Sequence, residues 1–137
     1  MNFTIHSLLF ALLIWAPASC DQKAAAPLPL KQEFDLKLGQ SVVVGEERVK
    51  INFVAVAEDS RCPEGAQCIW AGNAKIALTV RKGNAKPTSI ELNTGVTPQQ
   101  TSYMGHGIKL TGLRPHPKVN SSIDKKSYVA TLIVSKE

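Results

Sequence analysis

Two cysteines, Cys62 and Cys68, offer the clearest chemistry in this sequence, because a separation of six residues suits a small disulfide-closed loop. Pro63 and Gly65 lie between them and favour a turn. In an oxidising compartment such a bridge stabilises a fold by roughly 2–2.5 kcal/mol. A zinc site usually needs four ligands, and a thiol redox site favours a Cys-x-x-Cys spacing. The spacing therefore predicts a disulfide.

The stretch 59–73 around these cysteines admits two interpretations. In one, a stiffened loop presents Arg61, Glu64, Gln67 and Trp70 to a partner, since a loop ordered before binding loses less entropy. In the other, the bridge is a structural staple of a small β-protein, and Trp70 packs over the sulfurs as part of the core. The staple is the commoner arrangement in small secreted domains, and the residues leave both interpretations open.

The same stretch carries a resemblance to a known family. Arg-Cys-Pro at 61–63 and Cys-Ile-Trp-Ala-Gly at 68–72 resemble a motif of small bacterial envelope lipoproteins to which no activity is assigned. Leu-Arg-Pro-His-Pro at 113–117 is similar to a Leu-x-Pro-x-Pro-like segment that members tend to carry. The resemblance covers the chain from about Phe34 to its end. It implies a location and a fold, and supplies no chemistry.

The segment 1–19 is typical of an export signal, with an uncharged apolar core at 8–15 and small residues at 16–19. Its apolar stretch is shorter than the ~20 residues that span a bilayer. The run Ala18-Ser19-Cys20 resembles the end of a bacterial lipobox, which predicts that Cys20 becomes the first residue and carries palmitate or a similar acyl chain. Cleavage after the Ala-Pro-Ala at 16–18 would instead give a secreted protein.

Cysteine counting favours the lipid. The chain has three cysteines, so pairing of Cys62 with Cys68 leaves Cys20 over. Asp21 follows directly and resembles the signal that retains lipoproteins in the inner membrane of enteric bacteria. We therefore expect a lipid-anchored protein that faces the periplasm, with residues 20–33 as a flexible tether.

Residues 34–137 suffice for one domain with a single core. The net charge is +5, and the basic residues are dispersed without an aromatic-interleaved basic patch. This distribution argues against nucleic acid as a partner. It supports mild attraction to anionic lipid or to an acidic polymer, beside an unknown envelope protein.

Alternating apolar and polar residues predict about seven short strands and no amphipathic helix. We expect an all-β fold, either an antiparallel β-sandwich or a small barrel, in which 94–107 is a loop. The expected strands are 33–38, 41–44, 48–56, 74–82, 88–93, 108–113 and 127–135. The expected core comprises Ile51, Phe53, Ile76, Leu78, Val80, Leu110, Tyr128, Ala130 and Leu132.

The chain offers few groups for catalysis, since no Gly-x-Ser-x-Gly elbow is present. His106 stands between two glycines and is expected to be a solvent-exposed turn residue rather than a ligand. We therefore expect no cofactor, no metal and no enzyme activity.

Three hypotheses for the function follow. The leading one is a membrane-tethered binding module whose Cys62–Cys68 loop contacts an envelope component. The second is a proteinase inhibitor in which Arg61 occupies a trypsin-like pocket. The third is a periplasmic metal-binding protein that uses His106, His116 and Met104.

Overall fold

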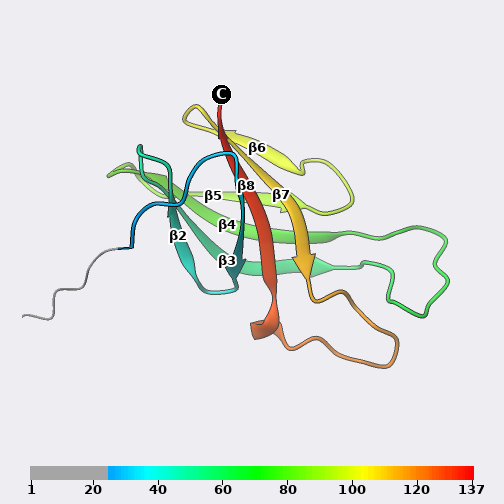
Figure 1. Cartoon of the computed structure of the whole chain (residues 1–137). Helices are drawn as coiled ribbons and strands as arrows, with labels where there is room; N and C mark the ends of the chain where they lie inside the picture. Colours follow the sequence, from blue (N-terminus) through cyan, green and yellow to red (C-terminus); the bar gives the residue numbers. More distant parts are fainter. Residues whose placement is uncertain (1–24) are drawn as a thin grey trace, which may run out of the picture.

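The computed structural model describes residues 25–137, which form two four-stranded antiparallel sheets. One sheet has the strand order β2-β3-β4-β5 and the other β1-β8-β7-β6 (Figure 1). The two sheets stay separate, so the sandwich is confirmed. The strands are β1 (Glu33–Lys37), β2 (Ser41–Val44), β3 (Val49–Asp59), β4 (Ala74–Lys82), β5 (Thr88–Asn93), β6 (Gln100–Tyr103), β7 (His106–Arg114) and β8 (Val129–Lys136). A short 3-10 turn, η1 (Lys125–Ser127), precedes β8.

The export signal, Cys20 and Asp21 lie outside the described residues. The described part of the chain contains no helix with the length and apolarity that crossing a bilayer needs.

Alternation along the strands builds the core. In β4, Ala74, Ile76, Leu78 and Val80 are all fully buried, while the residues between them face outward. Since successive side chains of a strand point to opposite faces, this pattern lays one apolar face of the sheet on the other sheet. All nine residues of the expected core are buried, so that prediction is confirmed.

An eighth strand, β6, lies within the stretch that we expected to be a loop. Its four residues, Gln-Thr-Ser-Tyr, are polar except at the end and show no alternation that would mark a strand. Met104 and Gly105 join it to β7 as a two-residue turn, and both have positive φ (45° and 79°). A two-residue hairpin turn of type I′ requires a positive φ at both turn positions. The turn thus creates a strand that its composition did not predict.

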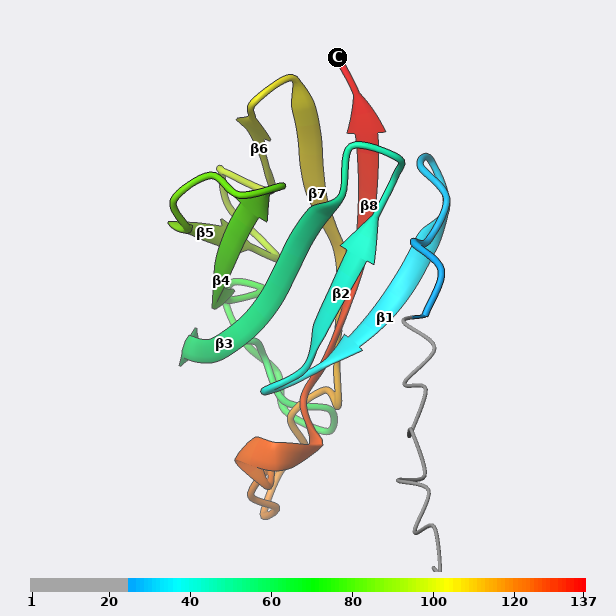
Figure 2. The ribbon, with the colours of Figure 1, turned by 90° about the vertical axis from the view of Figure 1, so that its left-hand side faces the viewer.

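β3 and β4 run on past the end of β2 and carry the stretch 59–73 at their far end (Figure 1). At the opposite end of these strands, Leu28 bridges Val44 of β2. Figure 2 shows the same arrangement from the side, with β1 and β2 next to each other in different sheets. The stretch 59–73 and the N-terminal part of the described chain therefore lie at opposite ends of the sandwich.

Candidate functional site

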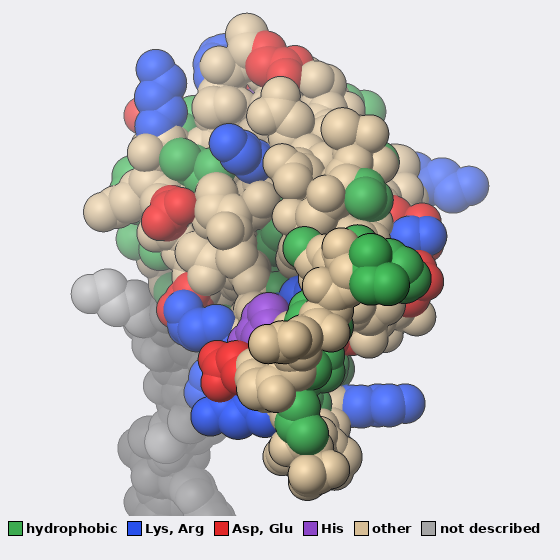
Figure 3. All heavy atoms as spheres, turned by 90° about the vertical axis from the view of Figure 1, so that its right-hand side faces the viewer, with side chains coloured by type: hydrophobic (Ala, Val, Ile, Leu, Met, Phe, Trp, Pro, Cys, Tyr) green, Lys and Arg blue, Asp and Glu red, His purple; other side chains and the backbone are tan. Residues whose placement is uncertain are grey.

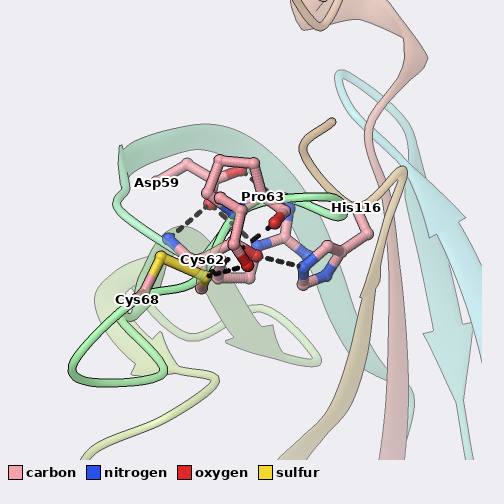
Figure 4. Close-up of a disulfide and its surroundings, with 7 residues drawn as sticks. Asp59, Cys62, Pro63, Cys68 and His116 are labelled. Atoms are coloured by element: carbon pink, nitrogen blue, oxygen red, sulfur yellow. Dashed lines mark hydrogen bonds and ion pairs between the residues drawn. A yellow bond between two sulfur atoms is a disulfide. The ribbon is translucent and has the colours of Figure 1, made fainter. Parts of the chain in front are cut away.

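Cys62 and Cys68 form a disulfide, which confirms the predicted pairing (Figure 4). The strands β3 and β4 continue into the loop as a ladder, because the Ser60 amide donates to the Asn73 carbonyl at 2.7 Å and the Cys62 amide to the Ala71 carbonyl at 2.8 Å. The loop is therefore closed twice, once by sulfur and once by backbone hydrogen bonds.

Gly72 makes this narrow base possible. Its φ is +73°, and a Cβ atom at this position would lie 1.8 Å from the Ser60 carbonyl oxygen. Any other residue would have to move the backbone of the opposite side of the loop, which a well-paired ladder resists. Gly95 packs on the outside, where its amide donates to the side-chain oxygen of Asn73 at 2.9 Å. The glycine of the Cys-Ile-Trp-Ala-Gly run is thus a structural requirement.

Arg61 lies beneath the loop and is only 8% exposed. Its Nε and Nη2 atoms donate to the two carboxylate oxygens of Asp59 at 2.8 and 2.7 Å. Nη1 donates to the Leu113 carbonyl at 2.7 Å, and Nη2 to the Pro115 carbonyl at 2.9 Å. Asp59 belongs to one sheet, and Leu113 belongs to the other. The expectation that Arg61 is presented to a partner is therefore wrong, because the guanidinium joins the two sheets.

Tyr128, the residue immediately before β8, completes this network. Its hydroxyl donates to Asp59 Oδ2 at 2.8 Å. Burial and the hydrogen bond to the Asp59 carboxylate raise the pKa of Tyr128 to about 12. Burial alone would raise the pKa of Asp59, but hydrogen bonds from Arg61 and Tyr128 outweigh it and hold that pKa below its usual value. Asp59 is therefore a carboxylate fixed by two donors.

The segment 114–120 supports the loop from the side of the other sheet. The Nε2 atom of His116 donates to the Cys62 carbonyl at 2.8 Å. The Glu64 amide donates to the Pro117 carbonyl at 2.9 Å, and the Val119 amide to the Glu64 carbonyl at 3.1 Å. The two runs that carry the family resemblance, 61–72 and 113–117, therefore lie against each other.

The outer part of the loop presents side chains to solvent. Ile69 is 94% exposed and Trp70 is 71% exposed, so Trp70 does not belong to the core as the staple interpretation expects. Gln67 is exposed, and Glu64 lies 3.7 Å from the ammonium group of Lys118. Figure 3, which views the molecule from this end, shows hydrophobic side chains standing out beside charged ones. The candidate contact residues are thus Glu64, Gln67 and Trp70, with Ile69 added and Arg61 removed.

Ile69 is not among the contact residues predicted from the sequence, because the exposure of one apolar side chain depends on packing that the sequence does not show. Sequence reasoning missed the role of Arg61 although a signal was present. Residues 59 and 61 are two apart on an extended chain, which places their side chains on the same side. An Asp and an Arg in that relation can pair.

The opposite end of the sandwich holds a second charged cluster around Glu47. Its carboxylate forms ion pairs with Lys82 of β4 and with Lys136 of β8, the latter at 3.0 Å. The hydrogen bonds that Lys82 and Lys136 donate to this carboxylate lower the pKa of Glu47 to about 2. His106 Nε2 lies 3.6 Å from the same carboxylate.

His106 is 1% exposed, so the prediction that it is a solvent-exposed turn residue is wrong. It is the first residue of β7, and the alternation of that strand turns its ring inward, where Nδ1 lies 3.2 Å from the Met104 carbonyl. His116 follows the far end of β7, so the structure does not bring the two histidines together. Within residues 25–137, no three His, Cys, Asp or Glu side chains are grouped to hold a metal ion.

Comparison of the chain with protein-family models, with curated proteins and with solved structures gives no match.

Proposed function

We propose that the chain is a membrane-tethered bacterial envelope lipoprotein whose β-sandwich is a non-catalytic binding module. In this proposal the outer part of the Cys62–Cys68 loop contacts another envelope component. The observation that carries it is the exposure of Ile69 and Trp70 on a loop that is fixed at its base. A large aromatic side chain on an already ordered loop is a common centre of a binding interface, because little entropy is lost on contact.

The position of the loop suits a tethered module. The described chain begins beside the start of β3, and the loop follows the end of that eleven-residue strand. At ~3.3 Å per residue, about 30 Å separates the two ends. A lipid on Cys20 would therefore anchor one end of the sandwich and leave the loop pointing away from the anchor, toward a partner.

A photo-cross-linking amino acid at position 70, in the chain expressed in bacterial cells, tests the binding function. We expect one discrete cross-linked species. The matched control carries the same group at position 104, because Met104 is also exposed (55%) but lies at the opposite end of the sandwich. Ile69→Ser in the position-70 protein should reduce the yield of the adduct at least fivefold. Equal adducts from positions 70 and 104 would contradict the proposal.

The tether is tested separately by the intact mass of the protein from bacterial membranes. A chain that starts at Cys20 and carries acyl chains supports the anchor. A chain that starts at Ser19, recovered from the soluble fraction, contradicts the anchor and leaves the binding function of the loop standing.

The inhibitor hypothesis loses support from the burial of Arg61. A trypsin-like pocket takes an extended, accessible basic side chain, whereas this guanidinium makes four hydrogen bonds beneath the loop. The metal-binding hypothesis would need His106 and His116 to act apart. Neither alternative has a specific observation in its favour.

A further inference from the structure

The outer half of β3 has an unpaired edge. β2 pairs only with the first part of β3, where Ser41 faces Asn52. Phe53 is the last residue held on that side, through hydrogen bonds with Gly39 (2.8 Å) and Gln40 (3.0 Å). From position 54 to 58, β3 pairs with β4 alone among the described residues. The backbone groups that point away from β4 are therefore available over about the length of one short strand.

A cavity of about 530 Å³ runs along this edge. Leu38, Val56 and Ile123 give it an apolar lining, and Val54 is 54% exposed at its side. Ligand pockets in proteins commonly have volumes of ~300–1,000 Å³. Most of the lining residues come from β3 and from the segment that precedes β8, so the groove lies between these two parts of the chain.

Three charged residues line the groove, and two of them, Glu58 and Lys125, have no charged partner among the described residues. Asp59, which also lines the groove, is held by Arg61 and Tyr128. The free charges are thus one acid and one base, so a complementary ligand carries one group of each sign.

We infer that this edge binds an extended peptide segment of a partner protein, which adds to the sheet as a strand beside residues 54–58. The unpaired backbone N–H and C=O groups of residues 54–58 favour a peptide over a small apolar molecule. Only an extended chain presents matching donors and acceptors at strand spacing. An apolar side chain of the peptide fills the groove between Leu38 and Ile123. A basic side chain meets Glu58, and an acidic one meets Lys125.

The local shape of β3 limits this pairing to a short segment. The register with β4 shifts between Phe53 and Ala55 and again between Val56 and Glu58. Bulges of this kind increase the twist of an edge and oppose flat pairing with a second copy of the same strand. A short extended peptide with adaptable ends is therefore the better occupant. This site goes beyond the proposed function, since it uses neither Ile69 nor Trp70.

The test uses the full chain and a panel of capped eight-residue peptides that alternate valine and threonine, with lysine at one end and glutamate at the other, in both directions. Binding is measured by calorimetry, and amide exchange by NMR or mass spectrometry. We expect one direction to bind at least tenfold more tightly than the other and to slow amide exchange at positions 54–58.

N-methylation of alternate amides in the bound peptide gives the sharpest control. A strand pairs through one edge, so methylation in one phase should abolish binding and methylation in the other phase should leave it within about twofold. If both methylated peptides bind equally well, or if neither binds, the inference is overturned. Absence of binding across the whole panel also overturns it.

Substitutions locate the site. Val54→Lys should weaken binding at least tenfold, whereas Met104→Lys, at an equally exposed apolar residue, should leave it unchanged. Lys125→Glu, in an exposed turn, should weaken binding of the peptide that carries glutamate and provides a second variant if Val54→Lys impairs folding. Ile69→Ser should have no effect, which separates this site from the loop. Self-association that Val54→Lys abolishes would show a second copy at this edge and contradict the inference.

Discussion

At each end of the sandwich one carboxylate links the two sheets, but the two carboxylates differ in burial. At the loop end, Asp59 of one sheet binds Arg61 and Tyr128, and Arg61 continues to carbonyl groups of the other sheet. At the opposite end, Glu47 binds Lys82 of its own sheet and Lys136 of the other. Each end is thus joined across the two sheets through one carboxylate.

The two clusters differ in how far their side chains are exposed to solvent. The side chains of Asp59 and Arg61 are 10% and 8% exposed, whereas those of Glu47 and Lys136 are 37% and 64% exposed. A buried charge that loses its partner stays desolvated, while an exposed one is rehydrated. The loop end should therefore depend strongly on its ion pair, and the opposite end should not.

Arg61→Met has the largest expected effect, because it leaves the Asp59 carboxylate unpaired and removes the donors to two carbonyl groups. We expect a loss of about 3–5 kcal/mol in the free energy of unfolding, measured by urea denaturation. Restoring part of the loss with Asp59→Asn in the same chain would confirm that the unpaired carboxylate is the cause. A loss below about 1 kcal/mol would remove the difference between the two ends.

Removing the disulfide comes next. Cys62→Ser with Cys68→Ser should reduce stability by roughly 2–2.5 kcal/mol, since a short loop loses its constraint in the unfolded chain. The backbone hydrogen bonds at the base of the loop should keep the amides of Ser60 and Cys62 protected in hydrogen exchange. Unfolding of the entire β3–β4 end would show that sulfur, and not the ladder, orders the loop.

Tyr128→Phe removes one donor from Asp59 and should cost roughly 1.5 kcal/mol at neutral pH, because Arg61 still holds the carboxylate. The pKa of Tyr128 is raised from 10.0 to about 12, so the neutral hydroxyl stabilises the fold. This contribution is fully present below pH 10 and is lost as the pH rises toward 12. The stability difference between the natural chain and Tyr128→Phe should therefore shrink over that window. A difference that stays constant from pH 9 to 12 would contradict the assigned hydrogen bond.

Glu47→Gln should have the smallest effect on stability. The side chains of its lysine partners, Lys82 and Lys136, are 32% and 64% exposed, so water can reach both of them. We therefore expect a shift in the urea midpoint that is barely larger than that of Glu46→Gln, the neighbouring exposed acid. An effect of the size seen for Arg61→Met would show that exposure does not distinguish the two clusters.

The sequence predicted those features that depend on periodicity and cysteine spacing. The core of β3, β4 and β8 follows from alternation, and the Cys62–Cys68 bond from its short, turn-rich spacing. Both are local patterns. β6 was not predicted, because its own residues show no alternation. It forms through the tight turn at Met104 and Gly105 that pairs it with β7.

The candidate site was harder to predict because burial depends on contacts far along the chain. Arg61 is buried through carbonyl groups more than fifty residues away. Trp70 is exposed because the base of the loop is filled by that guanidinium and by the 114–120 segment. His106 is buried by the inward phase of β7, which begins two residues earlier than expected.

The fluorescence of Trp70 tests the central claim most directly, since Trp15 lies in the predicted export signal and Trp70 is then the single tryptophan of the mature chain. An exposed side chain on a rigid loop predicts emission like that of tryptophan in water, efficient quenching by iodide, and anisotropy that decays with the tumbling of the whole domain. Blue-shifted emission shielded from iodide would place Trp70 in the core. Rapid local depolarisation would show a mobile loop, and either result would contradict a fixed loop that presents Trp70 to a partner.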